Sequence, residues 1–236
     1  MFAKLYLMKR LGIVGGLGPE TSCQFFLNVN NKIIKETRIQ PEMIMENVPM
    51  SEVILEDLAH GKKPSLVFNL LKESVIRLNK IHSDIIVIPC NTVHIFINQL
   101  RIISRAPILS IIEESAKECV HQNFKKIGVL ASTTSIKERL HLDELRKFGI
   151  QGLIPTVNQQ EEISQIIIRL VTNKVGVNDK DYLNFIIKDL QHRGADSILL
   201  ACTDLRMIIS PLDVDLPIVE TTTVLENAVV KLFLNT

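Results

Sequence analysis

Two cysteines of this chain occupy closely similar sequence settings. Cys90 lies six residues after Asp84, and Cys202 lies six residues after Asp196, with apolar residues filling most of each interval. Uninterrupted apolar runs are typical of strands that are buried on both faces, as in parallel sheets. Each cysteine is therefore expected just beyond the carboxyl end of a buried strand, which is where ligands bind in open α/β sheets.

The residues after each cysteine favour the start of a helix. Asn-Thr follows the first cysteine and Thr-Asp follows the second, and these residue types accept hydrogen bonds from the first N–H groups of a helix. A helix N-terminus lowers the pKa of a nearby thiol and also binds carboxylates. If the two halves face one another, a small carboxylate substrate would present its α-carbon between the two sulfurs. One thiolate would then remove the α-proton while the other group, as a thiol, returns a proton on the opposite face.

The remaining cysteines and the histidines suggest less chemistry. Cys23 and Cys119 fall inside helical patterns and are interpreted as small buried hydrophobes. There is no CxxC pair and no zinc-like spacing of cysteine with histidine, so neither a metal nor a cofactor is predicted. His94 lies four residues after Cys90, on the same face of a helix that starts at once, where it either tunes the thiol or simply caps and packs.

A glycine-rich segment, GGLGP at residues 15–19, follows an apolar run and precedes a helical pattern. It supplies GxG, but Thr21 stands where a dinucleotide fingerprint has its third glycine, so nucleotide binding is a weak alternative. The other interpretation is that these glycines let the backbone approach a small ligand closely.

The elements that must position these residues alternate between strands and helices. Helical spacing of apolar residues is clearest in segments 25–33, 64–78, 163–170 and 182–190, and the predicted strands are 11–14, 43–48, 85–88, 127–130 and 197–200. This alternation predicts an α/β fold with parallel sheets and right-handed crossovers. A helical protein with short buried segments is the alternative. The repeated strand and cysteine pattern further predicts two related halves.

Composition excludes several classes of protein. The chain has 236 residues, 46% of them hydrophobic and 22% charged, with a net charge of +1. This balance disfavours both bulk electrostatic binding of nucleic acid and disorder. There is no run of eighteen apolar residues and no secretory signal at the N-terminus, so no membrane association is expected and a cytoplasmic location is predicted.

Three segments together resemble the aspartate/glutamate racemase family: GGLGP at 15–19, PCNTVH at 89–94 and ACTD at 201–204. The resemblance runs from about Lys9 to the C-terminus, which makes the first residues an extension or places the true start at Met8. It implies a cofactor-independent amino-acid racemase with two pseudo-symmetric α/β domains, a site in the cleft between them, and a homodimer. The implied first domain is 1–103 plus 211–236, and the implied second domain is 104–210.

The resemblance also implies roles for individual residues. Cys90 and Cys202 match the paired acid and base. Residues that match substrate-binding positions are Leu17, Met50, Asn91, Thr92, Thr133, Lys174 and Thr203. Among them, Asn91, Thr92 and Thr203 would hold the α-carboxylate or amino group, and Lys174, placed with a small gap, would bind a substrate carboxylate.

One departure from the family pattern affects the choice of substrate. Aspartate racemases commonly carry an arginine in the loop after the second strand, and residues 47–54 contain none. The loop is closer to that of broad-specificity members. The prediction is a racemase that acts on aspartate, glutamate or a related amino acid. The alternative is a non-catalytic small-carboxylate-binding or regulatory protein with the same cleft.

Overall fold

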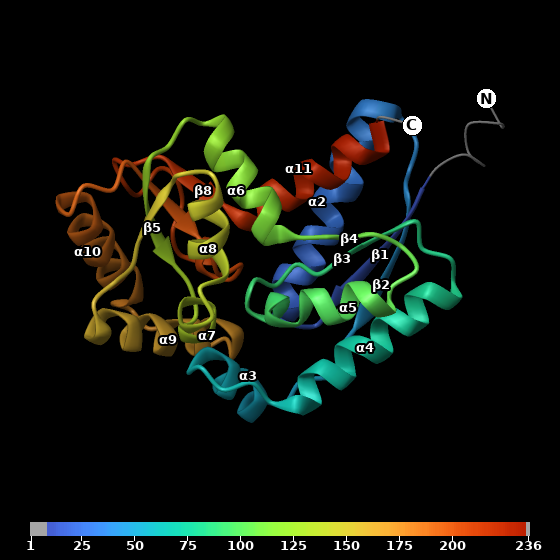
Figure 1. Ribbon diagram of the computed structural model, residues 1–236, viewed down its shortest axis with the longest axis horizontal. Coiled ribbons are helices and arrows are strands. Elements are labelled where there is room, and N and C mark those ends of the chain that lie inside the picture. Colours follow the sequence, from blue (N-terminus) through green and yellow to red (C-terminus); the bar gives the residue numbers. More distant parts are fainter. Residues whose placement is uncertain (1–8, 235–236) are drawn as a thin grey trace.

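The computed structural model describes residues 9–234, in which two four-stranded parallel sheets form the framework (Figure 1). The strand order is β2-β1-β3-β4 in the first sheet and β6-β5-β7-β8 in the second. The strands are β1 (Arg10–Gly15), β2 (Glu42–Asn47), β3 (Ile85–Val87), β4 (Ile108–Leu109), β5 (Lys126–Leu130), β6 (Gln151–Leu153), β7 (Ser197–Leu200) and β8 (Ile218–Glu220). The predicted α/β class is confirmed.

The helices lie between the strands in chain order and cover the sheets. They are α2 (Pro19–Thr37), α3 (Glu52–Ala59), α4 (Ser65–Lys80), α5 (Ile97–Ile103), α6 (Ile111–His121), α7 (Thr133–Lys137), α8 (Leu140–Lys147), α9 (Val157–Val171), α10 (Asp179–His192) and α11 (Thr221–Leu234), with short 3₁₀ helices η1 (Thr92–Phe96) and η2 (Leu205–Met207). The five strands and four helices expected from periodicity are all present. Strands β4, β6 and β8 were not predicted, because none of them lies in an uninterrupted apolar run like the one at 85–88 that contains β3.

The internal repeat extends to the hydrogen bonds at the start of each sheet. The carboxylate of Asp84 accepts a bond of 2.6 Å from the backbone N–H of Arg10 in β1. In the second half, the carboxylate of Asp196 accepts from the N–H groups of Lys125 and Lys126 at 2.7 and 3.1 Å. Both aspartates therefore fix the first residue of the middle strand pair in the same way, and the two sheets have the same strand order.

Each half completes its core with a helix that follows the last strand of the other half. Helix α6 follows β4 of the first sheet, yet its Ala116 and Cys119 pack with Ile127 and Leu145 of the second half. Helix α11 follows β8 of the second sheet, yet it packs against α2. The two helices also lie against one another between the halves (Figure 1).

This exchange changes where the halves divide. The predicted return of residues 211–236 to the first domain applies to α11, whose Leu225 and Val229 join the core around Phe25. It does not apply to β8, which pairs with β7 in the second sheet. In the same way β4, placed beyond residue 103 in the second domain, pairs with β3 in the first sheet. The reason is the repeat itself, since β8 occupies in one sheet the position that β4 occupies in the other.

Two further observations concern single elements. Cys119 is buried as expected, but Cys23 is exposed, which corrects its interpretation as a core residue. On α2 the buried face carries Phe25, Val29 and Ile33, and position 23 points away from that face.

Within residues 9–234, none of the helices combines the length and the apolar character that crossing a bilayer requires.

Candidate active site

Cys90 and Cys202 line one small cavity of about 40 Å³ between the two halves. Half of the lining residues are polar or carry the thiols, and they come from the carboxyl ends of the middle strands and the turns that follow. The other half are apolar. The lining residues are Leu17, Leu55, Leu58, Ala59, Cys90, Asn91, Thr92, Ser132, Ile167, Ile168, Val171, Cys202, Thr203 and Asp204.

Cys90 follows β3 after a two-residue extension and begins the turn into η1. Its sulfur is approached by the backbone N–H groups of Val93 and Thr92, which favour the thiolate. Burial nevertheless outweighs them and raises the pKa of the Cys90 thiol to about 12. The sequence predicted a lowered pKa here. The structure reverses that direction, because removing the charged thiolate from water costs more than two N–H groups return.

Cys202 is placed in the same way after β7. The N–H groups of Asp204 and Leu205 approach its sulfur, at the same offsets as the two N–H groups around Cys90. Burial first, and then the Asp204 carboxylate, hold the pKa of the Cys202 thiol well above its usual value. A charge on Cys90 also raises the pKa of Cys202, so the two sulfurs are close enough to influence each other.

Asp204 is a site residue that sequence reasoning treated only as a helix-starting residue. The Cys202 thiol donates to its Oδ2 at 3.8 Å, and Thr21 of α2 donates to its Oδ1 at 2.6 Å. Burial raises the pKa of the Asp204 carboxyl, and the Thr21 hydroxyl opposes that rise. The acid at the second position after the cysteine was the available signal, but the sequence gave no indication that Thr21 would reach it from the other half.

The glycine-rich segment brings the first half up to this carboxyl. Gly18 has φ +98°, and a Cβ added there would lie 2.8 Å from Oδ1 of Asp204. Leu17 lines the cavity, as predicted. The segment thus serves close approach of the backbone, and its acidic neighbour disfavours the nucleotide phosphate considered as an alternative, since like charges repel.

The polar side chains near Cys90 are mostly hydrogen-bonded, but one acceptor, the amide oxygen of Asn91, has no partner. The Asn91 amide donates to Thr221 at 2.9 Å, while its Oδ1 is buried without a partner. The Thr92 hydroxyl lies 2.8 Å from the hydroxyl of Ser132, so these two groups join the halves across the cavity. An ammonium group would satisfy Asn91 Oδ1, and the Thr92 hydroxyl could donate to a carboxylate by turning away from Ser132, which already donates to Ser135 at 3.1 Å.

His94 supports the loop that carries Cys90. Its Nε2 accepts from the backbone N–H of Ile111 at 3.3 Å, which leaves Nδ1 as the donor to the Cys90 carbonyl at 2.8 Å. Burial lowers the pKa of His94 to about 4, so the ring is neutral. Of its two predicted roles, the packing and positioning role is the one that these contacts describe.

Helix α3 covers the cavity from the first half and contacts α7 and α9 of the second half. The backbone carbonyl of Leu58 accepts from the Thr134 hydroxyl, and that of Ala59 accepts from Ser164 at 3.2 Å. Lys63, just beyond the helix, pairs with Glu138 at 2.5 Å. The helix is therefore attached to the opposite half in its covering position.

Three residues that were predicted to bind substrate do not line this cavity. Thr133 contacts Ser164 at 2.8 Å instead. Met50 packs against the hydrophobic core of the first half that contains Val48 and Leu58. Lys174 is exposed in the turn after α9, where a lysine side chain is solvated. Position along the chain could not reveal these orientations, because adjacent residues at a helix start point in different directions.

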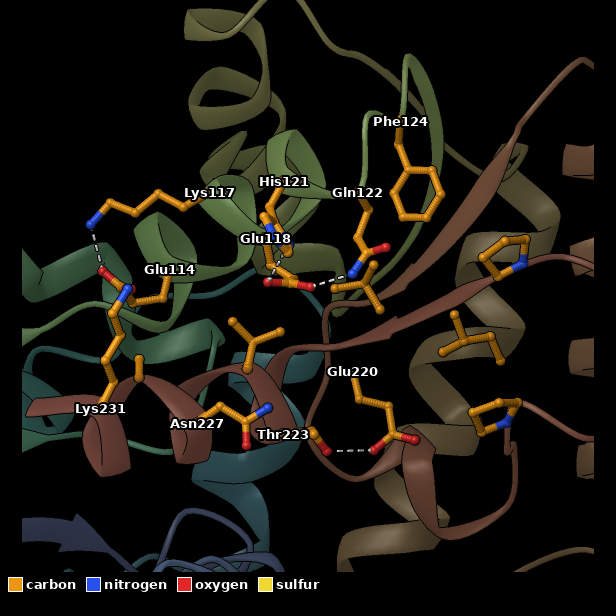
Figure 2. A pocket seen from close by; sticks show the side chains of 16 residues that line it. Glu114, Lys117, Glu118, His121, Gln122, Phe124, Glu220, Thr223, Asn227 and Lys231 are labelled. Atoms are coloured by element: carbon orange, nitrogen blue, oxygen red, sulfur yellow. Dashed lines mark hydrogen bonds and ion pairs between the residues drawn. The ribbon is translucent and has the colours of Figure 1, made fainter. Parts of the chain in front are cut away.

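A second and larger hollow lies beside α6, α11 and β8, on the opposite side of the molecule from α3 (Figures 1 and 2). Its volume is about 640 Å³. Most of its labelled polar side chains pair with one another, as Lys117 does with Glu114 at 2.6 Å and Gln122 with Glu118 at 2.7 Å (Figure 2). None of its lining residues carries a buried polar atom without a partner, and none is a cysteine. The chemistry therefore points to the smaller cavity. Across residues 9–234, no cluster of three acidic, histidine or cysteine side chains is suited to hold a metal ion.

The structure is an α/β protein with two cysteines in a cleft between its halves, and sequence comparison gives its family. Residues 14–229 match the Asp/Glu/Hydantoin racemase family, and the chain belongs to that family. The predicted resemblance is thereby confirmed over nearly the whole chain.

Individual relatives are distant but span the full length. The broad specificity amino-acid racemase RacX of Bacillus subtilis is 24% identical over 234 residues, which is 95% of this chain and 98% of that protein. Among solved structures, the aspartate racemase of Picrophilus torridus has a TM-score of 0.80 at 22% identity, covering 94% of this chain and 93% of its own. The glutamate racemase of Francisella tularensis, in complex with D-glutamate, has a TM-score of 0.65 at 13% identity, covering 96% of this chain and 81% of its own. At these identities the solved structures establish a shared fold.

Proposed function

We propose that this protein is a cofactor-independent amino-acid racemase in which Cys90 and Cys202 act as the acid–base pair at the α-carbon. The observation that carries the proposal is that both sulfurs line one cavity, each at the end of a middle strand and each facing two backbone N–H groups. Membership of the racemase family and the name of the RacX relative support the reaction class.

The reaction conserves atoms and electrons without a redox step. One cysteine thiolate takes the α-proton, so that an S–H bond forms as the C–H bond breaks and the electron pair passes toward the substrate carboxylate. The opposite thiol then gives its proton to the other face of the carbon, and its own S–H electrons stay on sulfur. Because burial raises both pKa values, each sulfur holds its proton at neutral pH, and the thiolate, once formed, is a strong base toward the weakly acidic α-proton.

The substrate's two fixed groups find partners around Cys90. Asn91 Oδ1, buried and unpartnered, would accept from the α-ammonium group. The hydroxyl of Thr92, turned away from Ser132, and that of Thr203 beside Cys202 would hold the α-carboxylate. The acidic or related substrate, the homodimer and the cytoplasmic location expected from the sequence stay predictions.

Hydrogen exchange at Cα tests this assignment. The protein is incubated in D₂O with single-enantiomer amino acids, and deuterium at Cα is followed by NMR while optical rotation reports inversion. The expected result is exchange together with inversion, without added cofactor, and loss of inversion in Cys90→Ala and Cys202→Ala. Cys23→Ala is the matched control, because that cysteine is exposed outside the cavity. If none of the amino acids exchanges its α-hydrogen, the non-catalytic binding protein is favoured. Full inversion in either active-site variant would refute the two-cysteine mechanism.

A further inference from the structure

The part of the cavity left for a substrate side chain is apolar. Seven of the fourteen lining residues are aliphatic. Six of these come from two helices that contact each other across the halves, and one comes from the glycine-rich segment. They are Leu17, Leu55, Leu58, Ala59, Ile167, Ile168 and Val171. A wall of this kind offers van der Waals contact and no hydrogen bond to a side chain.

No cation faces this cavity from the described residues. Its lining contains no lysine, arginine or histidine, and its one charged side chain is the acidic Asp204. The nearby Arg206 pairs with the buried Glu226 at 3.3 Å. Arg169, on the same helix as the aliphatic wall, is held by Asp179 at 2.6 Å and by Glu162 at 2.7 Å. A second substrate carboxylate would be desolvated here without a partner and near a like charge.

The aliphatic wall is also fixed in place. The carbonyls of Leu58 and Ala59 are already bonded to the hydroxyls of Thr134 and Ser164, so they do not serve as polar contacts for a ligand. The whole cavity, its polar part included, is about 40 Å³, which is small beside the several hundred Å³ typical of pockets for larger ligands. The geometry favours a compact side chain.

We propose that this site selects amino acids with compact, uncharged, apolar side chains, in the range from alanine to leucine or methionine, over aspartate and glutamate. The inference rests on the proposed racemase function and, within the expected range of aspartate, glutamate or a related amino acid, favours related apolar amino acids over the acidic ones. The family assignment does not carry it. It depends on the residues that this chain places on α3 and α9.

A side-chain series tests the selectivity. Deuterium exchange at Cα is measured for the L and D forms of alanine, valine, leucine, methionine, aspartate, glutamate and lysine, and kcat/KM is compared. The apolar substrates are expected to exceed aspartate and glutamate by roughly 100-fold or more, because an unpaired carboxylate must be buried.

A charge introduced into the wall provides a second arm. Ile168 is half-buried at the cavity, so Ile168→Lys places an ammonium group near the substrate side chain and leaves its stem against the wall. It is expected to raise the ratio of aspartate to leucine turnover roughly tenfold or more, while Ile168→Gln, polar but neutral, does not.

The outcomes separate the two proposals. Fastest exchange with aspartate, glutamate or lysine in the unmodified protein would overturn the apolar selectivity and leave the racemase function standing. Equal responses of Ile168→Lys and Ile168→Gln would also count against it. Exchange with none of the amino acids would instead remove the proposed function on which the inference rests.

Discussion

The two cysteine-bearing turns have the same backbone plan and different side chains. In each, the sulfur faces the N–H groups of the second and third residues that follow it. The second residue after Cys90 is Thr92, whose hydroxyl contacts Ser132, whereas the second residue after Cys202 is Asp204, whose carboxylate contacts the thiol itself. The shared backbone positions two equivalent sulfurs, and one side chain makes their affinities for a proton unequal.

The inequality assigns a resting arrangement to the pair. A carboxylate beside a thiol disfavours its ionisation, so Cys202 retains its proton more firmly than the geometry of the turn alone would require. The same carboxylate also raises the pKa of Cys90, but there it follows burial and the backbone N–H group of Val93 in importance. We expect the active form with one negative charge to carry it on Cys90 and to keep Cys202 as the thiol.

The largest effect is expected from removing one sulfur. In Cys90→Ala the remaining thiolate would exchange deuterium into one enantiomer without inverting it, and in Cys202→Ala the other enantiomer would exchange. Racemisation should fall by about 10²- to 10⁴-fold in both, the usual contribution of a positioned acid or base. NMR of Cα deuterium with each pure enantiomer measures this. The same enantiomer preference in both variants would show that the sulfurs do not act on opposite faces.

Neutralising the carboxyl should have a smaller effect. Asp204→Asn removes a negative charge that raises the pKa of Cys202, so that pKa falls and the alkaline limb of the kcat/KM profile moves to lower pH. Activity at neutral pH should change less than in the cysteine variants, because burial, the larger cause of the raised pKa, still keeps the Cys202 thiol protonated there. The reciprocal change, Thr92→Asp, should raise the pKa of Cys90 and move the acidic limb to higher pH. If neither limb of the kcat/KM profile moves in either variant, the proposed difference in pKa between Cys90 and Cys202 is refuted.

Substitution by alanine can be compared at two glycines with positive φ, one in crowded and one in open surroundings. Gly18 has φ +98° with Asp204 Oδ1 at 2.8 Å from an added Cβ, while Gly149 has φ +72° with nothing within 4 Å. Gly18→Ala should cost about 2–4 kcal/mol of unfolding free energy, and Gly149→Ala about 1–2 kcal/mol, because only the first adds a clash to the backbone strain. Urea denaturation measures both, and equal costs would contradict the close approach at Gly18.

The smallest effects are expected at the paired aspartates. Asp84→Ala should lose about 1 kcal/mol, and Asp196→Ala about 1–2 kcal/mol, because the first accepts one backbone N–H and the second accepts two. Thermal or urea denaturation of the two variants, set beside the parent protein, gives the difference. A larger loss of unfolding free energy in Asp84→Ala than in Asp196→Ala would contradict the view that the number of backbone N–H groups accepted by each aspartate sets its contribution.

The sequence was most informative where local patterns determine position. The apolar runs before Cys90 and Cys202 placed both sulfurs at strand ends, and the matched aspartates indicated the repeat. The contribution of Asp204 was not evident, because it depends on Thr21 from the other half of the chain. Lys174 was matched to a substrate-binding position by the family resemblance with a small gap, and it lies exposed in the turn after α9.

The covering role of α3 was also beyond prediction. Its apolar residues indicate a buried face, but a helical pattern does not say which distant helix that face will meet. The contact with α9 that forms the aliphatic wall depends on the tertiary arrangement. The expectation of aspartate, glutamate or a related amino acid came from the family resemblance, whereas the assembled cavity contains no cation among its lining residues.

The reciprocal helices α6 and α11 have a mechanical consequence. Each of these helices follows a strand of one half and packs into the core of the other half. Any opening of the cleft that keeps both cores intact must therefore rotate the two halves about α6 and α11. Helix α3 is attached at the far end by a few side-chain contacts to backbone carbonyls. We therefore expect the contacts of α3 to break before those of α6 and α11, which would open the cavity on the side of α3.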